Sequence, residues 1–198
     1  DSHSAWPWRL GREANVLELD NLTYWEVIDA IKTKSPRKFK FTIETNPSYG
    51  KYHWTGHRQC GVSVPASEAI SLKNICPKCG RRLTKGVEQR VEELADRPDG
   101  RKPQNAINFI HLLPLSEIIA TTIGSESPSS PKVWHLYNIL IERFRDEYSV
   151  LLDASKEEIA QVADDRIADT IIRVREDKVK VTPGYDGVYG RIYLMAEN

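Results

Sequence analysis

Three cysteines and one histidine form the pattern with the clearest chemistry in this sequence. One segment reads HRQCG from His57 and another reads CPKCG from Cys76, so the pattern is H-x2-C-x15-C-x2-C. In each half, two potential ligands stand two residues apart and a glycine follows, which permits the tight turn that brings both side chains to one ion. Three thiolates and one imidazole are typical of a closed tetrahedral structural site, and thiolates favour zinc over magnesium or calcium. The sequence therefore predicts one structural Zn²⁺ ion, with the ligands His57, Cys60, Cys76 and Cys79.

Other interpretations of these residues are open. His53 is an alternative fourth ligand, and we favour His57 because it completes two symmetric halves. Reduced, buried cysteines without a metal are the plainest alternative. A redox role for Cys76 and Cys79 is disfavoured because no strand-then-helix context brackets them. An odd number of cysteines with a C-x-x-C indicates metal in a reducing compartment and not disulfides, so we expect a cytoplasmic protein.

A carboxylate and an imidazole stand one residue apart at the start of the chain, at Asp1 and His3. On an extended segment both side chains could reach a metal cluster, but a catalytic cluster needs further ligands. His111 and His135 lie in apolar or helical stretches and are expected to be core or surface residues. On its own this pattern is weak, and a terminus without function is the simpler interpretation.

Basic side chains gather locally although the 28 basic and 28 acidic residues cancel. One group surrounds Pro36, and a second surrounds the CPKCG segment. Such groups can neutralise phosphates, and aromatic residues between them, Tyr49, Tyr52 and Trp54, can stack on a base. Solvated faces and core aromatics are the alternative. The candidate DNA-binding residues are Arg58, Lys78, Arg81, Arg82, Lys85, Tyr185 and Tyr189.

Apolar periodicity predicts the elements that position these residues. We expect a helix over 24–31 that ends near Ser35, a strand over 39–43, and a short helix over 64–73 that Ser63 caps. Further helices are expected over 86–95, 115–123, 133–148 and 167–174. Ser155 and Glu158 form a capping-box signature, and turn residues around 183–187 predict a terminal hairpin.

The segment 151–175 has the rhythm of a helix-hairpin-helix element. DNA-binding versions use a glycine-rich hairpin whose amides meet phosphate. Here Asp164, Asp165 and Arg166 occupy that position, and two carboxylates would repel phosphate. We therefore favour a structural helical hairpin.

Two classes of function are disfavoured. No apolar run approaches the ~20 residues that span a bilayer, and no signal peptide is visible, so we expect no membrane partner. The chain lacks a G-x-x-x-x-G-K-[ST] loop and cannot hydrolyse ATP by that route.

Several long strings resemble the endonuclease Q family of DNA-repair nucleases from archaea and some bacteria. They are WPWRLGRE at 6–13, GKYHWTGHRQCGVS at 50–63, ICPKCGR at 75–81, RVEELADRP at 90–98 and PGYDGVYG at 183–190. The resemblance implies an α+β fold in four parts. These are the end of a PHP-type β/α domain (1–50), a zinc-knuckle or ribbon domain (51–98), a linker (99–114), and a helical domain with a C-terminal β-hairpin (115–198).

The resemblance also implies an activity for a longer protein. Such enzymes recognise uracil, hypoxanthine, xanthine or abasic sites in double-stranded DNA and nick on the 5′ side of the lesion. By resemblance, Asp1 and His3 close a PHP site for further divalent metal ions, whose other ligands lie in an upstream PHP domain. The isolated chain is then expected to be inactive. A non-catalytic zinc-containing DNA or protein adaptor and a helicase-associated domain are the alternatives.

Overall fold

A computed structural model describes residues 8, 10–98 and 100–193 of the chain. The chain divides into two compact units. The helical unit comprises the chain up to Thr45 together with Pro103–Val179. The cysteine unit comprises Asn46–Lys102 together with the chain from Lys180 onward. Each unit thus combines two separate stretches of sequence, whereas the sequence suggested successive segments.

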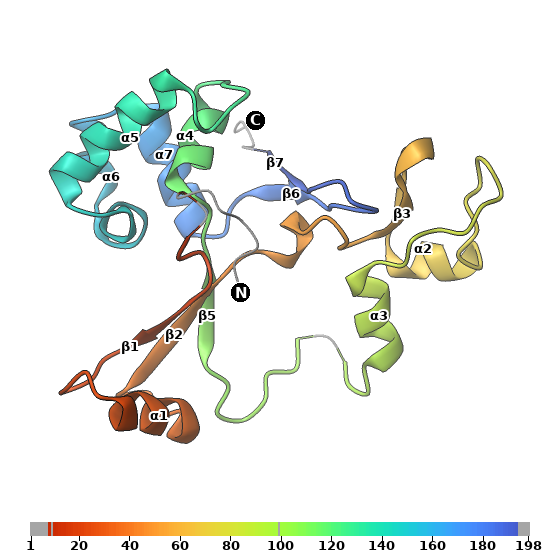
Figure 1. The fold of residues 1–198 in the computed structure, drawn as a ribbon, viewed down its shortest axis with the longest axis horizontal. Coiled ribbons are helices and arrows are strands. Elements are labelled where there is room, and N and C mark those ends of the chain that lie inside the picture. Colours follow the sequence, from red (N-terminus) through yellow and green to blue (C-terminus); the bar gives the residue numbers. More distant parts are fainter. Residues whose placement is uncertain (1–7, 9, 99, 194–198) are drawn as a thin grey trace. The chain divides into compact units, whose positions relative to one another are not determined.

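A three-stranded sheet of the helical unit has the order β1-β2-β5 (Figure 1). Strand β1 (Ala14–Leu17) pairs antiparallel with β2 (Phe39–Glu44), and helix α1 (Tyr24–Thr33) connects them. Strand β5 (Asn108–His111) pairs parallel with β2. The predicted helix and the predicted strand are confirmed, and residues 45–107 form the connection between the two parallel strands.

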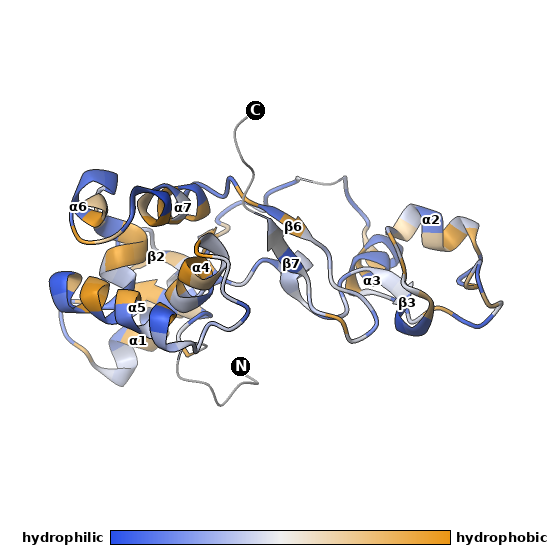
Figure 2. Cartoon of the chain, turned by 90° about the horizontal axis from the view of Figure 1, so that it is seen from above, coloured by the Kyte–Doolittle hydropathy of each residue, from blue (hydrophilic) through white to orange (hydrophobic). Residues whose placement is uncertain are grey.

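Helices α4 (Leu115–Thr122), α5 (Pro131–Phe144), α6 (Lys156–Ala160) and α7 (Asp165–Arg175) enclose the main hydrophobic core. A one-turn π-helix, Ser149–Asp153, joins α5 to α6 after a short connection. Figure 2 shows hydrophobic and hydrophilic residues alternating along α5, as expected of an amphipathic helix. The fully buried core side chains include Leu115, Ile119, Leu140, Leu151, Ile159, Ile167 and Ile171.

Local capping explains where these helices begin and end. The Ser155–Glu158 capping box is confirmed at the start of α6. The Asp164 side chain accepts a hydrogen bond from the Arg166 amide at 2.8 Å and caps α7, so this carboxylate has a structural role in the helical hairpin. The helix expected over 133–148 instead ends at Phe144, because Arg145 has a φ of +77°.

The cysteine unit contains short elements: β3 (Thr55–His57), β4 (Val62–Val64), α2 (Ala66–Ser71), α3 (Val87–Leu94), β6 (Lys180–Thr182) and β7 (Arg191–Tyr193). Two 3-10 turns, Pro47–Tyr49 and Arg58–Cys60, complete it. A helix is present where we expected one over 64–73, but its predicted start, with Ser63 as the cap, is wrong. Val62 and Val64 pair with β3 and are buried, so helix begins only after Pro65.

The terminal hairpin is confirmed, since β6 and β7 pair antiparallel. The chain is therefore of the α+β class, with small separate sheets. Within the described part of the chain, every helix is too short or too polar to cross a lipid bilayer.

Candidate metal centre and the contacts around it

The first half of the predicted site is a turn between two paired strands. His57 ends β3, the 3-10 turn follows, and Cys60 ends that turn. The Gly61 amide donates to the Arg58 carbonyl at 3.2 Å, and Gly61 has a φ of +61°. Open space surrounds the position of a Cβ at Gly61, so the backbone conformation and not crowding requires glycine there.

The second half is a similar glycine-ended turn at Cys76–Cys79. The Gly80 amide donates to the Cys76 carbonyl at 2.9 Å, and Gly80 has a φ of +70°. The Cys76 amide in turn donates to the Arg81 carbonyl at 2.7 Å, which closes the turn. Two glycine-ended turns therefore present two side chains each.

The structure brings the four predicted residues together. His57, Cys60, Cys76 and Cys79 each offer one ligand atom, and these atoms all lie within 4.8 Å of one another. The Sγ atom of Cys79 lies 3.5 Å from Nδ1 of His57. Cys76 is buried in the small core formed with Val62, Val64, Ala69 and Leu83. The cluster is able to hold one metal ion beside the core of this unit.

The surroundings change the acidity of the thiols. Burial raises the pKa of Cys76, but hydrogen bonds from the amides of Lys78 and Cys79 and from His57 outweigh burial and lower this pKa to about 6. The neighbouring Cys79 thiol, together with burial, raises the pKa of Cys60 to about 11. One thiolate is thus favoured within the cluster, and a bound cation would favour the thiolate form of the others.

His53 lies outside this cluster. Its Nε2 is 3.4 Å from the Ser48 hydroxyl, and its buried Nδ1 has no hydrogen-bond partner among the residues that the structure describes. Burial lowers the pKa of His53, which favours the neutral ring. Of the two histidines considered as the fourth ligand, His57 is the one that the fold places beside the cysteines. Asp1 and His3 lie outside the described residues.

Asp186 connects the C-terminal turn to the first half of the site. Its carboxylate accepts a hydrogen bond from the Arg58 amide at 2.6 Å, across 128 positions of sequence. Burial acts to raise the pKa of Asp186, but the Arg58 amide, Thr84 and the Arg58 and His57 charges lower it overall. No local pattern in the sequence points to this contact, and only the hairpin motif at Asp186-Gly187 marks the residue as special.

A second interior contact holds α3 against β3. The buried Thr55 hydroxyl donates to Oε1 of the buried Gln89 at 2.7 Å and accepts from the Gly86 amide at 2.9 Å. Apolar residues of α3, namely Val87, Val91 and Leu94, are exposed instead. The helix predicted over 86–95 is therefore present, but a polar residue anchors it.

The candidate DNA-binding residues differ in whether their side chains already have a hydrogen-bond or ion-pair partner. The Lys78 ammonium donates to the Cys60 carbonyl at 2.8 Å, and Lys85 pairs with Glu93 at 2.6 Å. The Arg58, Arg81 and Arg82 side chains are exposed, and within residues 8–193 as described none of them has a carboxylate partner.

The two candidate tyrosines also have different surroundings. A Cβ placed on Gly56 would lie 2.5 Å from the Tyr185 ring, so Tyr185 packs closely over the β3 backbone. Tyr189 is exposed. Tyr185 therefore serves packing and is half-buried, whereas Tyr189 is the more exposed of the two.

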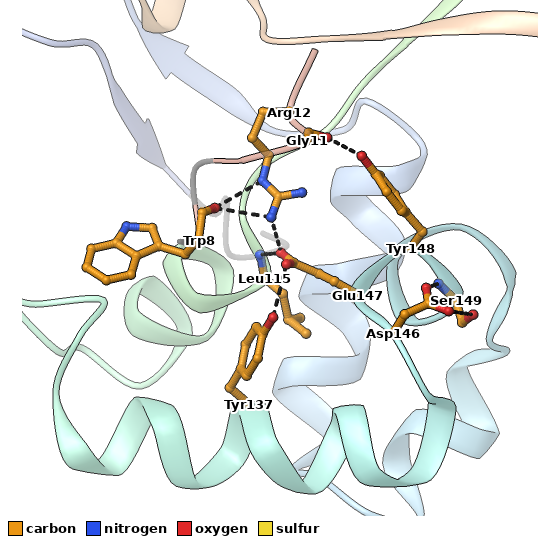
Figure 3. A network of polar contacts seen from close by, with 9 residues as sticks. All are labelled: Trp8, Gly11, Arg12, Leu115, Tyr137, Asp146, Glu147, Tyr148 and Ser149. Carbon is orange, nitrogen blue, oxygen red and sulfur yellow. Dashed lines mark hydrogen bonds and ion pairs between the residues drawn. The ribbon is translucent and has the colours of Figure 1, made fainter. Parts of the chain in front are cut away.

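An ion pair in the helical unit was not foreseen from the sequence (Figure 3). Arg12 is 7% exposed, and its guanidinium lies 2.6 Å from Oε1 of Glu147. The same carboxylate accepts from the Leu115 amide at 2.6 Å and from the Tyr137 hydroxyl at 3.1 Å. Burial and the Glu147 charge raise the pKa of Tyr137 to about 12. The string WPWRLGRE thus contributes a buried cation to the start of α4.

Sequence comparison finds relatives along nearly the whole chain. The family described as the MJ0043 C-terminal domain matches residues 114–178. The uncharacterized protein MJ0043 of Methanocaldococcus jannaschii is 34% identical over 201 residues, which cover 97% of this chain and 24% of the relative. The uncharacterized protein YqxK of Bacillus subtilis is 31% identical over 193 residues, covering 97% of this chain and 45% of the relative.

Structural comparison identifies two solved relatives. The lesion-specific endonuclease PfuEndoQ from Pyrococcus furiosus superposes with a TM-score of 0.86 at 38% identity, covering 97% of this chain and 47% of that one. Endonuclease Q in complex with a 27-mer duplex that carries an abasic lesion at the active site superposes with a TM-score of 0.81 at 38% identity, covering 96% and 47%.

The fold and the cluster define an α+β chain with a small unit that can hold a metal ion. Both the fold and the sequence of the chain are similar to those of endonuclease Q over 96–97% of its residues, which confirms the resemblance predicted from the sequence. The chain spans between about a quarter and a half of the length of the relatives that it matches.

Proposed function

We propose that this chain is the carboxy-terminal part of a DNA-repair endonuclease, in which it supplies a zinc-stabilised surface for damaged duplex DNA. The observation that carries the proposal is the TM-score of 0.86 at 38% identity to a lesion-specific endonuclease, maintained over 97% of the chain. A related structure that holds duplex DNA with an abasic lesion supports duplex DNA as the partner.

The proposed metal is Zn²⁺, held by His57, Cys60, Cys76 and Cys79. Zn–S bonds of about 2.3 Å and a Zn–N bond of about 2.0 Å place the nitrogen and a sulfur of a tetrahedral site roughly 3.5 Å apart. The His57 to Cys79 separation of 3.5 Å agrees with that value. Three sulfur donors and one imidazole also match the chemistry of structural zinc. When bound, the ion supplies folding energy and no chemical step.

The proposed catalysis belongs to a longer protein. Asp1 and His3 are proposed to close a second metal site whose remaining ligands come from an upstream PHP domain. Divalent ions there would activate water for attack on the phosphodiester on the 5′ side of the lesion. The proposed lesions are abasic sites and the deaminated bases uracil, hypoxanthine and xanthine.

The exposed arginines are proposed to hold the DNA backbone. Arg58, Arg81 and Arg82 border the two glycine-ended turns, so a folded cysteine unit presents their charges from fixed positions. Lys78 and Lys85 are weaker candidates, because Lys78 donates to a backbone carbonyl and Lys85 pairs with a carboxylate. Among the arginines, Arg81 donates only a long hydrogen bond of 3.4 Å to the Gln59 side chain. Phosphate contacts of this kind give binding that weakens steeply with salt.

Binding by the 198-residue chain tests the proposal. Three fluorescent duplexes of one sequence are compared: undamaged, with one abasic-site analogue, and with one uracil. We expect tighter binding of the two damaged duplexes. The variant Arg82→Ala should lower the slope of log affinity against log salt by about 1, because one phosphate contact is lost. Lys132→Ala, an exposed change on α5, is the matched control and should leave the slope unchanged.

Two results would contradict the proposal. One is equal affinity for damaged and undamaged duplexes at every salt concentration. The other is cleavage of the uracil duplex by the 198-residue chain itself, because the catalytic ligands would then lie within it. A longer protein with the PHP domain is expected to cut that duplex on the 5′ side of uracil.

A further inference from the structure

Two loops of the cysteine unit interlock through their backbones. Residues 47–53 and the turn 183–190 are joined by hydrogen bonds from the Gly184 amide to the Ser48 carbonyl (2.9 Å), from Gly187 to Lys51 (2.9 Å), and from Gly190 to Tyr49 (3.0 Å). These bonds hold the two loops in one relative position. The loops therefore form a rigid base for the side chains that they carry.

Glycine is required at two of these crossings. A Cβ on Gly184 would lie 2.3 Å from the Gly50 carbonyl oxygen, and a Cβ on Gly190 would lie 2.4 Å from the Ser48 carbonyl oxygen. Such approaches leave no room for a side chain. Asp186 and Gly187, with φ of +42° and +86°, form the tight turn that the Asp-Gly pair favours.

This base presents two tyrosine rings to solvent. Tyr52 is 46% exposed and Tyr189 is 54% exposed, although their backbones are fixed by the interlocked loops. The Lys51 ammonium lies 5.6 Å from the centroid of the Tyr52 ring and 5.8 Å from that of Tyr189. One cation thus lies close to both rings, and the Tyr49 ring lies 6.4 Å from Tyr189.

A second cation borders the same surface. The Arg58 guanidinium and the Tyr52 hydroxyl lie 3.5 Å and 3.8 Å from the position that a Cβ on Gly187 would occupy. Within the described residues, the Lys51 and Arg58 side chains have no carboxylate in ion-pair distance. The nearby Asp186 carboxylate is already bonded to the Arg58 amide. The surface therefore combines exposed aromatic faces with two available positive charges.

We propose that Tyr52, Tyr189, Lys51 and Arg58 form a platform that binds one unpaired nucleotide of a DNA strand. The tyrosine rings stack on the base, and the two cations contact the flanking phosphates. Every nucleobase has a π-face, so stacking of this kind is tolerant of sequence, while lysine and arginine supply the attraction to phosphate. The inference rests on the proposed function, because it takes DNA as the partner and identifies which part of it this surface meets.

The experiment uses the 198-residue chain and two duplexes. One carries a single unpaired 2-aminopurine as a bulge, and the other is the same sequence fully paired. We expect tighter binding of the bulged duplex and quenching of 2-aminopurine fluorescence on binding. Tyr52→Leu and Tyr189→Leu each remove a ring and keep apolar bulk, and each should weaken binding of the bulged duplex about 5- to 150-fold. Tyr189→Phe should restore both affinity and quenching.

Controls separate stacking from folding. Tyr193→Leu removes an equally exposed ring from β7 outside the platform and should change neither affinity nor quenching. Lys51→Ala should lower the salt slope by about 1 without abolishing quenching. Metal content and circular dichroism verify that each variant is folded. If Tyr189→Leu does not fold, the separate variants Tyr52→Leu and Lys51→Ala complete the test.

The outcomes distinguish the two proposals. If the unaltered chain binds neither of these two duplexes, the platform is wrong, and the proposed function is decided separately by the abasic-site and uracil duplexes described above. A different result is that the two tyrosine variants match the unaltered chain in affinity for the bulged duplex and in quenching of 2-aminopurine fluorescence. In that case the platform is wrong and the proposed function stands. Salt-sensitive binding that does not distinguish the bulged from the paired duplex also overturns the platform.

Discussion

At the scale of single residues, Glu147 shows how one side chain can organise a core. Its carboxylate meets the Arg12 guanidinium, the Leu115 amide at the start of α4 and the Tyr137 hydroxyl. Removing one partner of a nearly buried ion pair leaves an unpaired buried charge. The free-energy cost of that charge is larger than the net stabilisation that the intact pair provides. The charge of the buried Arg12 guanidinium is therefore balanced by the Glu147 carboxylate and not by water.

Removing this carboxylate tests its role. Glu147→Gln keeps the size of the side chain but leaves the Arg12 charge unpaired, so we expect unfolding free energy to fall by about 3–5 kcal/mol. Chemical denaturation followed by circular dichroism measures the change. Glu142→Gln, an exposed change on α5, should stay within about 0.5 kcal/mol of the unaltered chain. Equal stability of the two variants would show that the ion pair contributes little.

The two histidines of the cysteine unit provide a matched pair at the same scale. His57→Asn removes a member of the cluster, whereas His53→Asn changes a ring outside it. Metal analysis of the purified chain should find about one zinc per molecule, a content that His53→Asn retains and His57→Asn loses or binds far more weakly. Retention of zinc by His57→Asn with normal thermal stability would contradict the assignment.

At the scale of elements, α6 depends on reciprocal capping more than on length. Ser155 accepts a hydrogen bond from the Glu158 amide at 3.2 Å, and the Glu158 carboxylate accepts from the Ser155 amide at 2.9 Å. Donation from the Ser155 amide and then its hydroxyl lowers the pKa of Glu158. The helix is five residues long, so its position relies on this cap and on the buried Ile159.

This cap predicts a pH dependence of definite sign. A carboxyl whose pKa is lower in the folded state stabilises the fold above its unfolded pKa, and that stabilisation is lost as pH falls through the folded value. Glu158→Gln should therefore lower the melting temperature at pH 7, and this effect should shrink as the pH falls below the ordinary glutamate pKa of about 4.3 and wild-type Glu158 becomes protonated. Thermal melts at pH 7 and through the acid range measure this. Glu157→Gln, one residue away and outside the cap, is the control, and a constant difference across pH would refute the capping role.

The apolar stripe of α3 shows where periodicity misleads at this scale. Val87, Val91 and Leu94 recur at helical spacing, yet all three are exposed and the buried anchor is Gln89. Helical spacing reports that residues share a face, but the neighbouring elements decide whether that face is covered. Here the opposite side of the helix contacts β3, through the hydrogen bond between Thr55 and Gln89.

At the scale of the whole molecule, the cysteine unit is largely an insertion between two strands that pair. Strands β2 and β5 form a parallel ladder, and the chain between them contains all of Asn46–Lys102. The core of the helical unit is formed from its own helices, while the core of the cysteine unit is small and lies beside the cluster. The two units should therefore depend differently on metal.

Metal removal tests this difference. Structural zinc can contribute an apparent binding free energy of about 10–16 kcal/mol, which a small core cannot replace. We expect a chelator to remove amide protection against hydrogen exchange from residues 55–83 while α4, α5 and α7 keep theirs. Mass spectrometry of exchanged peptides measures both regions, with a chelator-free sample as control. Equal loss of protection in α7 would show that the helical unit does not fold independently of the metal.

The sequence alone was sufficient for features that depend on a few neighbouring residues. The spacing of His57, Cys60, Cys76 and Cys79, the alternation along β2, the cap at Ser155 and the Asp186-Gly187 turn all follow from local geometry. Cysteine pairs two residues apart can meet one ion only through a tight turn, so their types and spacing nearly determine the local shape.

Only the tertiary structure decided which distant segments meet. The Asp186 contact to the Arg58 amide spans 128 positions, Arg12 meets Glu147, and the terminal hairpin groups with Asn46–Lys102 instead of the adjoining helices. Such pairings form only where the contacts between two surfaces outweigh the entropic cost of closing a long loop. The periodicity of the sequence does not show which surfaces meet this condition. Tyr52 and Tyr189 lie near the same Lys51 ammonium for the same reason, because the two interlocking loops that carry them are more than a hundred residues apart in the chain.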